Sequence, residues 1–275
     1  MSAIEIDGFL SPEIEHYLHE CRGRYAAWFE LIQTINRFGQ SLLGEVQINP
    51  TNFQQSTAGL LYLRVLCHAQ GAVLLIERCM PTQAEVLCRA SLEALFGLLA
   101  VVERIDTARL LIKADRHHRL DLLKATLRRH ESLNADAQRQ TAVTLQDVKN
   151  DLERDPSPKI TTRCLAEWGG LVALYDSAYK ILSLPVHSNL RDLERQLGLD
   201  KNGNPTSIGW GPTLEGLDHL LMLIAETLTR AVAAMCGLFD LGHQENLQAI
   251  RNTYAPLAAS VVEAVGSDGE HTVPC

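Results

Sequence analysis

Aromatic side chains make up only 5% of this 275-residue sequence, and signals for β-strands are scarce. No stretch of alternating polar and apolar residues lies between hairpin turns, which argues against a β-sandwich or a barrel. The seven cysteines form no C-x-x-C pair, so neither a zinc knuckle nor a disulfide framework is expected. Their aliphatic surroundings predict buried, reduced thiols.

An excess of positive charge is also missing. The formal net charge is −8, so the chain as a whole does not attract phosphate backbones. The first ten residues carry Glu5 and Asp7 and lack the pattern of a signal peptide. No uninterrupted apolar run reaches the roughly 18 residues of a membrane span. Together these absences predict a cytoplasmic protein without membrane association.

Helix signals, by contrast, are abundant. Hydrophobic residues make up 46% of the chain, which is enough for a packed core. Apolar residues recur with helical spacing from Ser11 onward, and both Thr51 and Thr82 begin a capping-box pattern. We therefore predict an all-α fold, a bundle of about eight helices that includes long antiparallel ones.

The ends of the predicted helices are set by proline, glycine and polar capping residues. The helices span residues 11–39, 51–79, 82–102, 106–132, 135–154, 161–182, 186–197, 212–241 and 245–265, with a loop over 199–211. Asp155 to Pro158 is the clearest linker, because each of two prolines disfavours helix in the residue before it. We expect one helical domain over 1–265, a sub-boundary at 155–158 and a disordered tail over 266–275.

The helix predicted over 82–102 carries three charged residues on an otherwise apolar surface. Glu85, Arg89 and Glu93 are four residues apart and therefore lie in one stripe. In one interpretation this stripe faces solvent and holds weak intrahelical ion pairs. In the other, the helix is buried on every side and its charges face a polar pocket.

A later segment offers partners for that stripe. Tyr179, Ser183 and His187 follow one another at steps of four residues, so they can face one direction. Pro185 opposes this arrangement if it turns His187 away. Ser183 also has a structural alternative as the N-cap of the helix that Pro185 enters.

Two motifs give the sequence a family resemblance. The first is A-x-x-x-x-R-A-S-L-E over residues 84–93, and the second is Y-x-x-x-S-x-x-x-H over residues 179–187. This combination resembles DUF5677, a bacterial all-helical family of unknown function, with a likeness that covers residues 53–235. The sequence is also similar in general appearance to the HEPN helical bundles of toxin and phage-defence systems, whose dimers cleave RNA with an arginine and a histidine.

The HEPN resemblance implies a homodimeric hydrolase that acts on RNA or a nucleotide. HEPN ribonucleases carry arginine, four to six residues, then histidine, and the nearest spacing here, Arg64-x-x-x-His68, is one residue too short. RNA cleavage would require Arg89 and His187 to meet in space: the histidine for proton transfer and the arginine for phosphate charge. The expected catalytic set is Arg89, Glu93, His118, Tyr179, Ser183 and His187.

A second hypothesis is a carboxylate-bridged metal site within the bundle. Asp115-x-x-His118 has the acid-x-x-His spacing of such sites, and Glu85, Glu93 and His187 could complete the shell. The full signature requires a second such pair on a core helix, and the sequence does not provide one there. We therefore expect no cofactor and keep a divalent metal as the alternative.

The third hypothesis requires no chemistry. In it the protein is a homo-oligomeric interaction module in which Arg89 and Glu93 specify the pairing. An enzyme predicts that Arg89, Glu93 and His187 converge in a concave pocket. An interaction module predicts that they lie on a flat interface, or pair with one another without a cavity.

Overall fold

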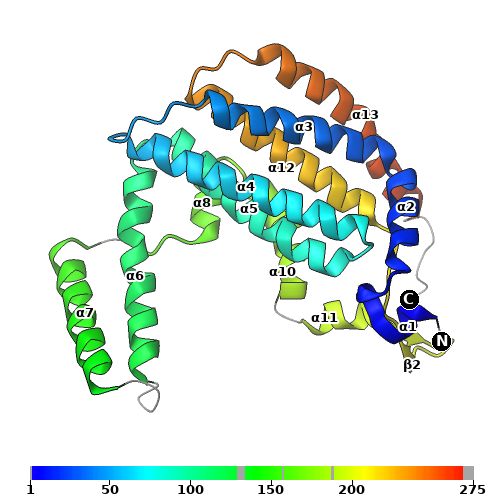
Figure 1. Ribbon diagram of the computed structural model, residues 1–275, viewed down its shortest axis with the longest axis horizontal. Helices are drawn as coiled ribbons and strands as arrows, with labels where there is room; N and C mark the ends of the chain where they lie inside the picture. Colours follow the sequence, from blue (N-terminus) through cyan, green and yellow to red (C-terminus); the bar gives the residue numbers. More distant parts are fainter. Residues whose placement is uncertain (1, 129–133, 157, 187–188, 269–275) are drawn as a thin grey trace.

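The computed structural model describes residues 2–128, 134–156, 158–186 and 189–268, with side chains as far as residue 263. It is an all-α protein, which confirms the predicted class, and its described residues form more and shorter helices than the eight expected (Figure 1). One small β-hairpin accompanies them.

Long helices fill most of the first 154 residues, short segments follow as far as Ile208, and the long helices α12 and α13 come last. The elements up to residue 154 are α1 (Ala3–Asp7), the 3₁₀-helix η1 (Gly8–Leu10), α2 (Ile14–Arg24), α3 (Ala26–Glu45), α4 (Phe53–Glu77), α5 (Pro81–Glu103), α6 (Thr107–Arg128) and α7 (Ala135–Arg154). After them come α8 (Thr162–Trp168), α9 (Val172–Leu174), the π-helix η3 (Tyr175–Tyr179), α10 (Lys180–Val186), α11 (Leu190–Leu193), the 3₁₀-helix η4 (Glu194–Gln196), β1 (Leu197–Leu199), β2 (Pro205–Ile208), α12 (Leu217–Leu238) and α13 (Gln244–Asp268).

Four helices enclose the core. α12 packs against α3, α4 and α5 (Figure 1), and Leu221 on α12 and Leu92 on α5 are both fully buried. α4 and α5 run antiparallel, with the Ser91 hydroxyl donating to the Val65 carbonyl oxygen at 3.3 Å. This packing fixes which face of α5 remains for other contacts.

A glycine allows α3 and α4 to approach closely. Tyr62 of α4 is fully buried, and its hydroxyl donates to the Gly39 carbonyl oxygen of α3 at 2.8 Å. A Cβ atom on residue 39 would lie 2.9 Å from that hydroxyl oxygen. Glycine at this position therefore makes room for the tyrosine.

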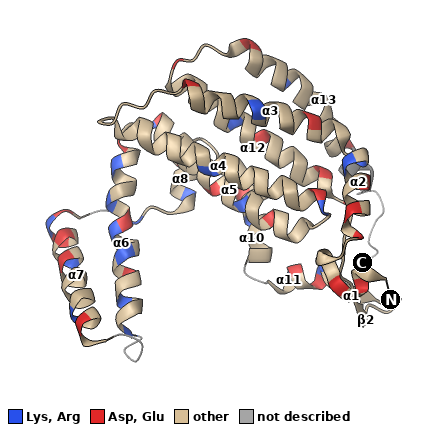
Figure 2. Ribbon diagram, viewed as in Figure 1, with Lys and Arg blue, Asp and Glu red and all other residues tan. Residues whose placement is uncertain are grey.

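The α6–α7 hairpin stands away from the bundle as an arm (Figure 1). Lys113 and Arg116 on α6 both pair with Asp155, which follows α7, at 2.8 Å and 3.3 Å respectively. Lys and Arg residues occur at several positions along α6 (Figure 2). The described residues of the predicted linker over 155–158 are not helical, and the sub-boundary there stays a prediction.

The structure corrects three predicted boundaries. The helix expected over 11–39 is divided at Tyr25, whose hydroxyl donates to the carbonyl oxygen of Leu214, a partner far away in the sequence. The loop expected over 199–211 contains β2, which pairs antiparallel with β1. Asp200 accepts backbone bonds from Asn202 and Asn204 in the connecting turn. Helix α13 extends to Asp268, into the tail that was expected to be disordered.

Among the described residues, two helices are long and apolar enough to cross a membrane by length and composition alone. These are α4, with a mean hydropathy of 1.6 and 33% of its most apolar window buried, and α12, with values of 1.5 and 61%. The sequence analysis considered only uninterrupted apolar runs, and polar residues interrupt the apolar sequence of both helices. Core helices pass the same test, so the expectation of no membrane association stays a prediction.

Candidate functional site

Four of the six predicted catalytic residues meet between α5 and the η3–α10 segment. The Arg89 Nε donates to the Ser183 Oγ at 3.0 Å, and the Arg89 Nη2 donates to the Tyr179 hydroxyl at 2.8 Å. The same Nη2 lies 2.8 Å from Glu93 Oε1, and the Tyr179 hydroxyl donates to that oxygen at 2.6 Å. We call these four residues the Arg89 cluster.

Local structure places the cluster. Arg89 and Glu93 are one helical turn apart on α5, while their neighbour Leu92 points into the core. On the facing segment, Tyr179 ends a π-helical turn, a rare feature that is frequent at functional sites. The Ser183 hydroxyl donates to the Tyr179 carbonyl oxygen at 2.8 Å, which leaves the serine oxygen directed toward Arg89.

Burial shapes the electrostatics of the cluster. Tyr179 is 7% exposed, Phe96 packs edge-on against its ring, and the Arg89 guanidinium lies over that ring at 5.0 Å from its centre. Burial, and next the hydrogen bond to Glu93, raise the pKa of Tyr179. The phenol therefore stays protonated at neutral pH and remains a donor to the Glu93 carboxylate.

Solvent still reaches the two charged members. The side chain of Arg89 is 19% exposed and that of Glu93 is 37% exposed. The stripe on α5 is thus neither fully solvated nor fully enclosed, and both predicted interpretations are only partly correct.

A histidine that was not in the predicted set lies on α4, the helix that packs against α5. Burial and then Arg64 lower the pKa of His68 on α4, while Glu93 on α5 acts in the opposite direction. The Arg64-x-x-x-His68 spacing was the available sequence signal, because it puts both residues on one face of α4.

The remaining predicted residues do not join the cluster. His118 is exposed on α6, and among the described residues no hydrogen bond or ion pair links it to the four. His187 lies outside the described residues. Glu85 instead pairs with Arg195 of η4 at 3.1 Å, and Arg195 also contacts Asp192 at 3.1 Å.

The proposed metal ligands are dispersed. Glu85 pairs with Arg195 and Glu93 with Arg89, while Asp115 is exposed on α6. Within the described part of the chain, no group of three or more His, Cys, Asp or Glu side chains is placed to hold a metal ion. The described residues therefore do not fit the carboxylate-bridged site.

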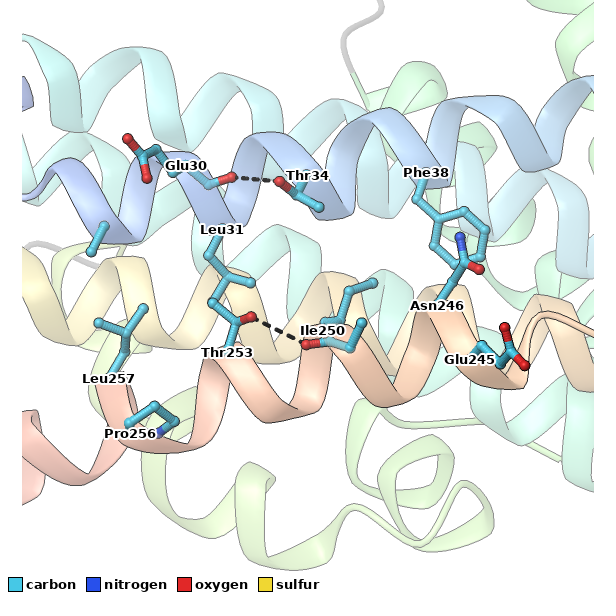
Figure 3. Close-up of a pocket in the computed structure, with 12 residues that line it drawn as sticks. Glu30, Leu31, Thr34, Phe38, Glu245, Asn246, Ile250, Thr253, Pro256 and Leu257 are labelled. Atoms are coloured by element: carbon cyan, nitrogen blue, oxygen red, sulfur yellow. Dashed lines mark hydrogen bonds between the residues drawn. The ribbon is translucent and has the colours of Figure 1, made fainter.

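Two cavities lie away from the Arg89 cluster. A groove of about 760 Å³ lies between α3 and α13 (Figure 3). The hydroxyls of Thr34 and Thr253 that line it each donate to a carbonyl of their own helix, at 2.9 Å and 3.1 Å. A second cavity, of about 690 Å³, lies where α10 meets α12 and α13. Neither has Arg89, Glu93 or Tyr179 in its lining.

Fold and site together define a helical-bundle protein with a hydrogen-bonded polar centre between α5 and η3–α10. Residues 55–205 match the model of DUF5677, described as a family of unknown function. Because the match covers more than half of the chain, the protein belongs to this family, and the predicted resemblance is confirmed. Comparisons with curated proteins and with solved structures gave no match. The HEPN likeness stays a prediction.

Proposed function

We propose that the protein is an enzyme that cleaves RNA or a related nucleotide at the Arg89 cluster. The observation that carries this proposal is the shared contact of Arg89 Nη2 with the Tyr179 hydroxyl and Glu93 Oε1, each at 2.8 Å. Cation, phenol and carboxylate are held together on two elements, and part of the cation and of the carboxylate is open to solvent. Burial, and next the hydrogen bond to Glu93, raise the pKa of the phenol, and titrating groups with perturbed pKa values are concentrated at functional sites.

RNA contains its own nucleophile, the 2′-hydroxyl next to each phosphate. A base removes the hydroxyl proton, the 2′-oxygen bonds to phosphorus, the bond to the 5′-oxygen breaks, and that oxygen takes up a proton. The products are a 2′,3′-cyclic phosphate and a free 5′-hydroxyl, with no net gain or loss of protons. The reaction needs a proton carrier and a cation, and no added co-reactant.

Arg89 and His68 are the candidates for these two roles. Arg89 would stabilise the additional negative charge on the five-coordinate phosphate. His68, whose pKa is lowered by burial, would be neutral at pH 7 and could accept the proton. Glu93 would hold the arginine through their ion pair and bias the imidazole by its charge.

The test is cleavage of labelled single-stranded RNA, with a parallel panel of nucleotides, by the full chain and two variants. Arg89→Lys and Glu93→Gln should each lower the rate by about 10²- to 10³-fold, because each alters the charge or the geometry that meets the transition state. Arg230→Lys is the matched control, since Arg230 forms another helical ion pair with Glu226, at 2.6 Å on α12. That control should cleave like the unaltered chain.

Two results would overturn the proposal. One is a full chain that leaves every RNA and nucleotide intact. The other is an activity that Arg89→Lys and Glu93→Gln do not change while mass spectrometry still identifies cyclic-phosphate products.

A non-catalytic interaction module is the second candidate. It is supported by the way in which the four side chains of the cluster satisfy one another. In that case Arg89→Lys lowers the thermal stability of the protein, and no substrate is consumed by any form of the chain.

A further inference from the structure

Two cysteines that are far apart in the sequence meet where α2 crosses the end of the bundle (Figure 1). Cys21 lies on α2 and Cys79 lies in the turn between α4 and α5, and both are fully buried free thiols. The Cys21 Sγ donates to the Ile76 carbonyl oxygen at 3.3 Å. The Cys79 Sγ donates to the Tyr17 carbonyl oxygen at 3.7 Å. We call Cys21 and Cys79 the thiol pair.

The two contacts of the thiol pair are reciprocal. The Ile76 carbonyl oxygen also accepts from the backbone amide of Cys79, at 2.8 Å, and Tyr17 lies one helical turn before Cys21 on α2. Each sulfur therefore approaches the backbone turn of the other cysteine, and the two thiols are hydrogen-bonded to each other. A thiol has one proton, so Cys21 donates either to the Ile76 carbonyl or to the Cys79 sulfur.

The backbone at Cys79 supports this contact. Cys79 has a φ of 55°, in the left-handed region that residues other than glycine rarely adopt. Its carbonyl oxygen accepts from the Thr213 amide at 3.2 Å, and the Tyr25 hydroxyl, one turn beyond Cys21, donates to the Leu214 carbonyl oxygen. Strained conformations persist only where the surroundings hold them. The structure thus maintains the turn that keeps the Cys79 sulfur beside α2.

We infer that the thiol pair is a site of thiol–disulfide exchange, at which Cys21 and Cys79 form a reversible disulfide with a low-molecular-weight disulfide as the oxidant. The thiolate of Cys79 attacks one sulfur of the small disulfide, a mixed disulfide forms, and one small thiolate leaves. The thiolate of Cys21 then attacks the Cys79 sulfur and releases the second small thiolate. The two protons from the cysteines end on the two small thiols, and the small disulfide is reduced by two electrons.

The order of attack follows from the hydrogen bond between the thiols. That bond lowers the pKa of Cys79, because the Cys21 thiol donates to the Cys79 thiolate, and it raises the pKa of Cys21. Cys79 is therefore the first of the two to lose its proton, and the thiolate is the form that attacks. In the described part of the chain, no hydrogen bond joins the sulfur of Cys67, Cys88 or Cys236 to another cysteine.

Burial determines how the oxidant reaches the pair. Both sulfurs are enclosed in the native fold, so α2 must open locally before a small disulfide can enter. α2 has 11 residues and lies at the edge of the bundle, so it can separate while α3, α4, α5 and α12 keep the core. Once formed, the bond would tie α2 to the turn between α4 and α5. This inference is independent of the proposed RNA cleavage.

Mass spectrometry of the full chain, incubated with oxidised glutathione, tests the inference. The unaltered chain should lose the mass of two hydrogen atoms, and its peptides that contain Cys21 and Cys79 should stay joined until a reductant is added. Cys21→Ser should retain one glutathione on Cys79, because no second thiol is present to release it. Cys79→Ser should react at Cys21 at least about 10-fold more slowly. Cys88→Ser is the matched control, since Cys88 is a thiol that is 2% exposed on α5, and it should form the same disulfide.

A second measurement uses only the unaltered chain. The oxidised form should unfold at a higher urea concentration than the reduced form, because the bond restricts the unfolded chain. A lower midpoint for the oxidised form would contradict the inference, since the bond would then distort the native contact. So would a chain in which Cys21 and Cys79 stay reduced at every ratio of oxidised to reduced glutathione while the exposed Cys67 takes up glutathione. Joined peptides that pair Cys21 or Cys79 with a different cysteine would also contradict it.

Discussion

The close approach of α3 and α4 at Gly39 makes a quantitative prediction. In Gly39→Ala the new methyl group would lie 2.9 Å from the Tyr62 hydroxyl and 3.2 Å from Leu66 Cδ2. Overpacking of this kind costs about 1–3 kcal/mol, whereas alanine in a helix interior gains about 1 kcal/mol over glycine. We expect a net loss of stability of up to about 2 kcal/mol.

Tyr62→Phe removes the oxygen that the methyl group meets. Alone, it should cost about 1 kcal/mol for the lost hydrogen bond to the Gly39 carbonyl. In the double variant the methyl group has more room, so the combined loss should be about 1 kcal/mol smaller than the sum of the single losses. Urea denaturation of all four forms, followed by circular dichroism, gives these free energies. Losses that add within about 0.5 kcal/mol would refute the steric argument.

Three further predictions concern single groups. Burial and the charge of Glu226 raise the pKa of Tyr254 to about 12, whereas the value in the unfolded chain is about 10. The free energy of unfolding should therefore fall as the pH rises from about 10 to about 12. Tyr254→Phe should make this fall smaller. Burial raises the pKa of Cys88 to about 12, so a thiol reagent at pH 8 should modify the exposed Cys67 and spare Cys88 until the protein unfolds. Leu92→Ala empties a fully buried site and should lower the free energy of unfolding by about 2–5 kcal/mol in urea titrations.

Local chemistry was sufficient to predict the long helices. α5 begins with Pro81 in its first turn and extends to Glu103, close to the predicted span of 82–102. α7 begins after Asn134, whose side chain accepts from the Ala137 amide. Such ends depend on residues within one turn, so the sequence contains the information that sets them.

Other features involve contacts between residues that are far apart in the sequence. At the break, the Tyr25 hydroxyl donates to the Leu214 carbonyl oxygen, and Glu85 pairs with Arg195; both partners are more than a hundred residues away. Neither contact leaves a periodic signal. The meeting of Arg89 with Tyr179 was expected from matching four-residue steps on two helices, whereas the effect of Glu93 on the pKa of His68 depends on how α4 packs against α5.

Helix α12 packs at the centre of the core but lies outside the segment that matches the family model. The residues that match the family model, 55–205, end before this helix, yet α4 and α5 bury their inner faces against it. A fragment cut at those limits would lose Leu221, Ile224 and Leu228 from the interior. The interior against which the matched segment packs in this chain is thus supplied in part by a helix outside that segment.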